Sequence, residues 1–298
     1  MTSSEPRSTA AAKYFTGNAV KESTGGAITR LVIGFILTTL SGLGLFSFVL
    51  YEILEFNGLI IEYLYIYTYD GWLWAIEAFV LLIGLILFIG GWSRLVSINR
   101  SYRMEVALKE PKPSDAQMDA WMAADKARII NDAMAKLELV ADSVINASDP
   151  LVVIGPATGT KIKSGQDGIF RLSRYEIVII YLTDYHLGAY SCELDFITGT
   201  VTMEQTQEYH YTDVVSVATL ISNSPFQIQT IDGMMHPIAR SQEFSLSVAS
   251  GQSIRVAVAF HQLPEMLKTG RLAPTGAEKA ISTLRTMLRE KKGGAAHI

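Results

Sequence analysis

The stretch LVIGFILTTLSGLGLFSFVL occupies residues 31–50, and GWLWAIEAFVLLIGLILFIGGW occupies residues 71–92. The first contains no charged residue, and the second contains one, Glu77. A helix rises about 1.5 Å per residue, so about 20 apolar residues cross the ~30 Å hydrocarbon layer of a bilayer. We therefore expect a transmembrane hairpin over residues 28–98, with helices at about 31–51 and 71–93.

Lysine and arginine flank this hairpin but are absent from its connecting segment, residues 51–70. Four precede the first stretch, and five follow the second by residue 112. Cytoplasmic loops of membrane proteins carry the excess of these residues. The N-terminus and the C-terminal domain are therefore both expected in the cytoplasm. A signal peptide is the weaker interpretation, because no small-residue cleavage site is obvious.

Small residues recur every four positions in the first stretch, at Gly34, Thr38 and Gly42. The second stretch carries Gly84 and Gly91. Small side chains on one face let two helix backbones approach closely in a membrane. They indicate a packing surface for the other span or for a second copy. The ordinary glycine content of a membrane helix is the alternative.

Glu77 is a candidate functional residue, because an ionised carboxyl group is costly in hydrocarbon. It would line a proton or ion path in a homo-oligomer. Alternatively, its depth of only ~9 Å from residue 71 lets it reach the headgroups or stay protonated against a neighbour. Beyond the second stretch, Arg94, Arg100 and Arg103 are expected to contact anionic lipid headgroups.

The remainder of the chain divides by composition. Residues 1–27 are rich in Ser, Thr, Ala and Gly and are expected to form a disordered cytoplasmic tail. Residues 99–150 predict a juxtamembrane linker and an amphipathic helix that opens at Ser114 with a capping box. Asp125 interrupts the apolar face of that helix. Residues 293–298 are expected to be a frayed tail.

From residue 151 the pattern changes to period two, with β-branched and aromatic residues between turn signals. This predicts an antiparallel β-barrel or sandwich over residues 151–292, closed by a C-terminal helix, and hence an α+β membrane protein with flanking helices. The expected strands are residues 151–154, 169–172, 176–182, 186–194, 200–203, 208–211, 214–220, 226–231, 244–249 and 254–260.

This arrangement resembles the pleckstrin-homology-like (PH-like) architecture, in particular the bacterial PH-like domains that follow membrane hairpins. The residues that carry the likeness are 179–184 with 186–190, 211–217, 244–258 and the helix at 278–292. The resemblance implies a binding or assembly module rather than an enzyme. It also implies a bacterial inner (plasma) membrane location. The extra strands and the insertion-like segment 221–241 depart from the simple pattern.

Basic residues of the β domain could contact lipid headgroups, as some PH-like domains do. The candidates are Lys161, Lys163, Arg171 and Arg174, and solvated surface charge is the alternative. A net charge of −4, with the basic residues gathered beside the hairpin, gives no signature of nucleic-acid binding.

Motifs for catalysis, cofactors or metals are not evident. Residues 155–161, GPATGTK, lack the Gly-Lys-Ser/Thr ending of a phosphate-binding loop. The five histidines and Cys192 have no metal-ligand spacing. No catalytic residue, cofactor or metal is therefore expected.

The sequence favours a non-enzymatic, membrane-anchored cytoplasmic binding or scaffold module that self-associates or recruits a protein or lipid partner. One alternative is a homo-oligomeric channel, transport or energy-coupling subunit that uses Glu77. A membrane-perturbing stress or defence component would share the same architecture.

Overall fold

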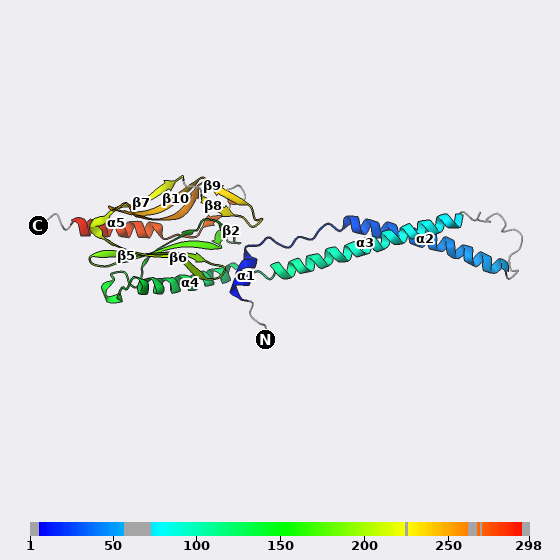
Figure 1. Cartoon of the computed structure of the whole chain (residues 1–298), viewed down its shortest axis with the longest axis horizontal. Helices are drawn as coiled ribbons and strands as arrows, with labels where there is room; N and C mark the ends of the chain where they lie inside the picture. Colours follow the sequence, from blue (N-terminus) through cyan, green and yellow to red (C-terminus); the bar gives the residue numbers. More distant parts are fainter. Residues whose placement is uncertain (1–5, 57–72, 224–225, 262–266, 269, 294–298) are drawn as a thin grey trace. The chain divides into compact units, whose positions relative to one another are not determined.

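A computed structural model describes residues 6–56, 73–223, 226–261, 267–268 and 270–293 (Figure 1). The chain forms two units. We call Asn18–Leu108 the hairpin unit, and Met1–Gly17 together with Lys109–Ile298 the β unit. The hairpin unit is thus an insertion, because the β unit contributes the chain on both sides of it.

Two long helices make up the described part of the hairpin unit, α2 (Gly25–Phe56) and α3 (Leu73–Lys109). By length and composition, their segments Gly25–Phe46 and Ala75–Lys109 could each span a membrane. Helix α3 runs well beyond residue 93, where we expected the span to end, because Pro111 is the first proline after it. The expected start of that span, residue 71, lies outside the described residues.

The β unit contains three sheets. The first has the order β1-β4-β5-β6, from Leu151–Pro156, Arg174–Leu182, His186–Asp195 and Thr200–His210. The second has the order β11-β10-β7, from Ser253–His261, Arg240–Val248 and Val214–Ser222. The third has the order β12-β3-β2-β8-β9, from Arg271–Leu272, Ile169–Leu172, Thr160–Ser164, Phe226–Gln229 and Met235–Ile238.

The first sheet is covered on both faces over β4 and β5, whereas most of β6 is exposed. On one face it packs against the second sheet and helix α5 (Ala277–Gly293), and Phe244 and Leu284 lie in this shared core. On the other face it packs against helix α4 (Asp115–Lys136), whose Met118 and Ile129 are buried (Figure 1). Burial on both faces explains the continuous apolar run of β4. In a strand with one face in solvent, every second side chain would be polar.

The N-terminal segment differs from the expected disordered tail. Residues Arg7–Tyr14 form helix α1, and Ala11, Tyr14 and Phe15 are buried. They join the core that lies between α4 and the first sheet. The expectation of disorder was therefore wrong for residues 7–14. This helix is short and has few apolar residues, and contacts with residues about 100 positions away stabilise it.

The expected closed barrel is also absent. In the part of the chain that the structure describes, the strands form three open sheets, two of which pack face to face. Strands β2, β9 and β12 were not expected, and β6 is one strand where we expected two. A bulge opposite Cys192, with Met203 at a φ of 51°, interrupts the alternation of β6 and explains the apparent break.

Candidate functional site

Arg171 on β3 is a buried cation of the β unit, with 4% of its surface exposed. Its Nε and Nη2 donate to the two carboxylate oxygens of Asp119, at 2.9 and 2.7 Å. Its Nη1 and Nη2 donate to Asp167, at 3.1 and 3.0 Å. A third carboxylate, Asp115, lies 3.6 Å from Nη1. One cation thus gathers three anions from α4 and the β2–β3 turn.

Tyr14 joins helix α1 to this cluster. Its hydroxyl donates to Asp115 Oδ1 at 2.6 Å, while Asp115 Oδ2 accepts from the Gln166 N–H at 2.8 Å. The Lys163 ammonium lies 3.9 Å from the centre of the Tyr14 ring. Burial, with the nearby charge of Lys112, lowers the pKa of Lys163. Burial and the contact with Asp115 raise the pKa of Tyr14.

Arg7, at the start of α1, binds Asp125 of α4. Its Nη1 donates to Asp125 Oδ1 at 3.0 Å, and its Nη2 contacts Asp125 Oδ2 and donates to the Phe196 carbonyl at 2.9 Å. The guanidinium also lies over the rings of Trp121 and Phe196, 5.6 and 4.9 Å from their centres. The buried carboxylate that interrupts the apolar face of α4 is therefore the ligand of a cation from α1.

Two lysines complete these links. Lys13 Nζ donates to the Glu110 carbonyl at 3.2 Å, and Lys112 Nζ donates to the Thr16 and Gly17 carbonyls at 2.8 and 3.2 Å. Residues 17 and 109 border the hairpin unit. We call the contacts of Arg7, Lys13, Tyr14 and Lys112 the α1 clip. It fastens the chain on the two sides of the insertion to each other and to the first sheet.

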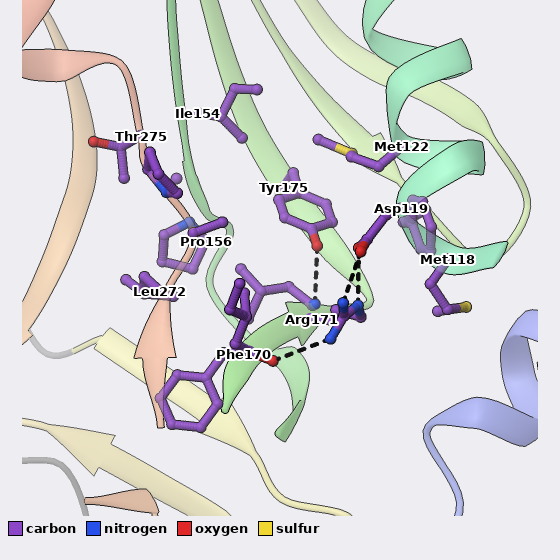
Figure 2. A pocket seen from close by; sticks show the side chains of 16 residues that line it. Met118, Asp119, Met122, Ile154, Pro156, Phe170, Arg171, Tyr175, Leu272 and Thr275 are labelled. Atoms are coloured by element: carbon purple, nitrogen blue, oxygen red, sulfur yellow. Dashed lines mark hydrogen bonds and ion pairs between the residues drawn. The ribbon is translucent and has the colours of Figure 1, made fainter. Parts of the chain in front are cut away.

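A cavity of about 200 Å³ lies beside the Arg171 cluster (Figure 2). Its walls come from α4, β1, β3, β4 and the segment before α5, and most of its lining is apolar. The Tyr175 hydroxyl lies in the wall, where it accepts a hydrogen bond from the Leu172 N–H at 3.0 Å. Burial raises the pKa of Tyr175 to about 12, so the hydroxyl keeps its proton. Among the described residues, no acceptor is found for that proton.

The four basic residues expected to bind headgroups do not form one free surface. Lys161 is exposed, but Lys163 is half-buried against Tyr14 and Arg171 is buried among carboxylates. Arg174 pairs with Glu193 on the neighbouring strand β5. Arg171 in particular is not available to a headgroup, because the contacts that hold it come from residues a sequence pattern does not place beside it.

The small residues of the hairpin lie mostly where α2 meets α3. A Cβ atom on Gly34 would lie 2.7 Å from the Gly84 carbonyl oxygen, and one on Gly84 would lie 2.8 Å from the Thr38 nitrogen. A Cβ atom on Gly91 would lie 2.7 Å from the Leu31 nitrogen. No described atom lies within 4 Å of the corresponding position on Gly42. The backbones of α2 and α3 therefore approach each other closely at Gly34, Gly84 and Gly91, but not at Gly42.

Glu77 lies on the same side of α3. A Cβ atom on Gly44 of α2 would lie 2.6 Å from Glu77 Oε1, so the half-buried carboxyl group occupies the space that this glycine leaves. Of the basic residues near the end of the span, Arg94 pairs with Glu22 at 3.7 Å. Arg100 and Arg103 are exposed on α3 beside Val96 and Met104.

Among the described residues, no three or more His, Cys, Asp or Glu side chains lie together so that they could hold a metal ion. Cys192 is buried, and burial raises the pKa of its thiol to about 11. A thiol that stays protonated is a poor nucleophile. Cys192 is therefore not activated as a nucleophile by its surroundings.

The sequence patterns missed the residues that assemble this site. Asp125 was noted only as an interruption, and Arg7 and Tyr14 were assigned to a tail. A buried-face aspartate in an amphipathic helix does signal an unseen cation, because a buried charge needs a partner. It does not say which of the 25 lysines and arginines supplies that cation.

Comparison of the chain with protein-family models, with curated proteins and with solved structures found no match to any of them.

Proposed function

We propose that this protein is a non-enzymatic binding module anchored to the bacterial inner membrane by the hairpin unit, with the β unit in the cytoplasm. The observation that carries the proposal is the insertion of two apolar helices into the β unit, with the α1 clip on the chain at both borders. Residues on both sides of the hairpin then belong to one folded unit, which requires both sides to lie in the same compartment.

The distribution of charge supports the cytoplasmic side. Arg100 and Arg103 are exposed on α3 after its most apolar part, where they can contact anionic headgroups of the inner leaflet. Two packed sheets with a helix against their shared core are elements that a PH-like module also has, and they support this part of the proposal. That likeness supports binding rather than catalysis.

The outer edge of β7 is the surface that best fits self-association or recruitment of a protein partner. Strand β7 lies at the edge of its sheet, and an edge offers unpaired N–H and C=O groups. Arg285 of α5 donates to the Val217 carbonyl, and Lys292 of α5 donates to the Val214 carbonyl. These hydrogen bonds cover the first half of the β7 edge. The other half exposes Leu220 and Ile221. It therefore combines apolar side chains with an accessible backbone.

Chemical cross-linking in membranes, with mass determination of the detergent-solubilised protein, tests this proposal. We expect the wild type to form a dimer or to retain a co-purifying protein, and the Leu220→Lys, Ile221→Lys double variant to lose it. Tyr185→Lys is the matched control, because Tyr185 is 80% exposed on the β4–β5 turn. A monomer without a partner in the wild type, or equal association of the double variant, would contradict the proposal.

The competing function is conduction through an oligomer lined by Glu77. The contact of Glu77 with Gly44 does not favour it, because the carboxyl group lies against the other helix of its own hairpin. Ion or proton flux into liposomes separates the two functions. The anchor predicts no flux from either the wild type or Glu77→Gln, whereas a flux that Glu77→Gln abolishes would establish the conducting alternative.

A further inference from the structure

We propose that the cavity beside Tyr175 binds a small, uncharged and mainly apolar molecule that carries one hydrogen-bond acceptor. The inference goes beyond the anchoring function and does not depend on it. Three features lie together: an apolar cavity, a guanidinium in its wall that is already bound by carboxylates, and the Tyr175 hydroxyl (Figure 2). The proton of that hydroxyl lacks an acceptor among the described residues.

The size of the cavity limits the ligand. An apolar cavity of about 150 Å³ in a protein interior stays dry and can bind benzene. The cavity here measures about 200 Å³. It therefore suits a single ring with a short substituent, or a chain of comparable bulk, and it is too small for the acyl chains of a phospholipid. Met118 and Met122 in its wall can adjust to ligands of different shape, because methionine is unbranched and flexible.

The charges around the cavity exclude an anionic ligand. Arg171 is the cation of the wall, but its guanidinium already binds Asp119 and Asp167 and lies 3.6 Å from Asp115. Three carboxylates against one guanidinium leave an excess of negative charge. A carboxylate or phosphate would find no available cation there and would lose its hydration, which is costly.

The position of the hydrogen-bonding group in the ligand follows from Tyr175. Its hydroxyl oxygen accepts from the Leu172 N–H, and its proton remains to be donated. A hydroxyl, ether or carbonyl oxygen of the ligand would accept this proton. The half-buried Tyr175 hydroxyl lines the cavity without a protein acceptor for its proton, so a ligand oxygen adds binding energy that a plain hydrocarbon lacks.

Photolabelling of the full-length protein in detergent tests the proposal. The probe is an eight-carbon alcohol that carries a diazirine, compared with the matched diazirine carboxylic acid and the matched hydrocarbon. We expect saturable labelling by the alcohol of peptides containing residues 118–122, 154–156 and 170–175, with competition by octanol. The acid should require at least about tenfold higher concentration, because of the three carboxylates.

Two variants make the test specific. Met122→Trp places a larger side chain in the wall and should abolish labelling of these peptides, whereas Met122→Leu keeps the volume and should preserve it. Tyr175→Phe should weaken labelling by the alcohol about tenfold but leave labelling by the hydrocarbon unchanged. A cooperative thermal transition of each variant shows that it is folded.

Three outcomes would overturn the proposal. The first is labelling of the cavity peptides that does not saturate or is not competed by octanol. The second is labelling by the acid that equals labelling by the alcohol. The third is unchanged labelling of folded Met122→Trp. Failure of membrane anchoring or of β7-mediated association would leave these measurements unaffected, so the two proposals fail separately.

Discussion

The hairpin unit and the β unit hold distant helices together by opposite means. In the hairpin unit, α2 and α3 touch at Gly34, Gly84 and Gly91, where the absence of side chains lets the backbones meet. In the β unit, α1 is held on α4 by the side-chain charges of Arg7 and Asp125. The difference agrees with the membrane position that we propose for the hairpin unit. Apolar helices gain nothing by burying more apolar surface in lipid, so close packing holds them instead.

The α1 clip also shows what a buried charge requires. Asp125 and Arg171 are both buried, and each has oppositely charged groups within hydrogen-bonding distance. Removing one member of such a pair is costly, because the other charge remains buried without it. Specific charges therefore act together with the buried Ala11, Tyr14 and Phe15 to set where α1 docks.

The largest expected effect comes from removing the cation of this pair. Arg7→Met should lower the free energy of unfolding of the β unit by about 3 kcal/mol, because the buried Asp125 then loses its two-fold contact with Arg7 and keeps only the longer contact with Arg128, at 3.3 Å. Denaturant unfolding followed by tryptophan fluorescence measures this, and faster proteolysis within residues 7–17 should accompany it. Lys126→Met on the exposed side of α4 is the control. Equal stability of Arg7→Met and the wild type would show that the ion pair does not hold α1.

The contact between the two hairpin helices should instead be destabilised by adding a side chain. Gly34→Leu should destabilise the contact of α2 with α3 by about 2 kcal/mol, because even a Cβ atom there would lie 2.7 Å from the Gly84 carbonyl oxygen. Unfolding by sodium dodecyl sulfate, followed by circular dichroism, measures the change. Gly42→Leu is the matched control, since a Cβ atom on Gly42 would have no described neighbour within 4 Å. If both leucines had the same effect, the small-residue contact would not be what joins the helices.

Glu176 on β4 sharpens the comparison, because it is a largely buried charge that faces other anions. Burial, and then the charges of Glu193 and Glu243, raise its pKa to about 7. Arg174 is the nearby cation, and it pairs with Glu193. The folded state then holds a proton that the unfolded state releases near pH 4.5. Stability should therefore fall as the pH rises from about 4.5 to about 7 and stay low above it.

The variant Glu176→Gln should remove this fall and raise the free energy of unfolding at pH 8 by about 2 kcal/mol. Denaturant unfolding of the wild type and the variant at pH 5 and pH 8 tests it. The two proteins should differ at pH 8 and converge at pH 5. If the difference in the free energy of unfolding between the two proteins were the same at pH 8 and at pH 5, the burial of this charge would be contradicted.

The smallest effect is expected at Tyr14. Tyr14→Phe keeps the buried ring but removes the hydrogen bond to Asp115, so it should cost about 1 kcal/mol. Denaturant unfolding measures the loss. Combined with Asp115→Asn, the two changes should cost less than the sum of their separate effects, because the residues share one contact. Strict additivity would indicate that Tyr14 and Asp115 do not interact in solution.

Local features of the fold were predictable from the sequence. The Ser114 side chain accepts from the Gln117 N–H, as its capping box predicted, and the expected strand at residues 169–172 coincides with β3. These features depend on neighbours within four residues or on a short alternating pattern. The two apolar helices follow from length and composition alone.

The long-range features were not predictable, for a physical reason. The partners of Arg171 lie 4 and 52 positions away, and those of Arg7 lie 118 and 189 positions away. A single sequence carries no signal for such pairs beyond the presence of an opposite charge. Arg171 was therefore interpreted as a surface cation although the fold buries it, and the cavity beside it was invisible.

The proposed anchoring requires above all that both sides of the hairpin lie in one compartment. Single cysteines at Thr9, Lys126 and Asn57, introduced in a Cys192→Ala background, test it by labelling with a membrane-impermeant maleimide in intact cells. We expect Asn57→Cys to be labelled in intact cells, and Thr9→Cys and Lys126→Cys to be labelled only after the membrane is permeabilised. Labelling of either Thr9→Cys or Lys126→Cys in intact cells would contradict it.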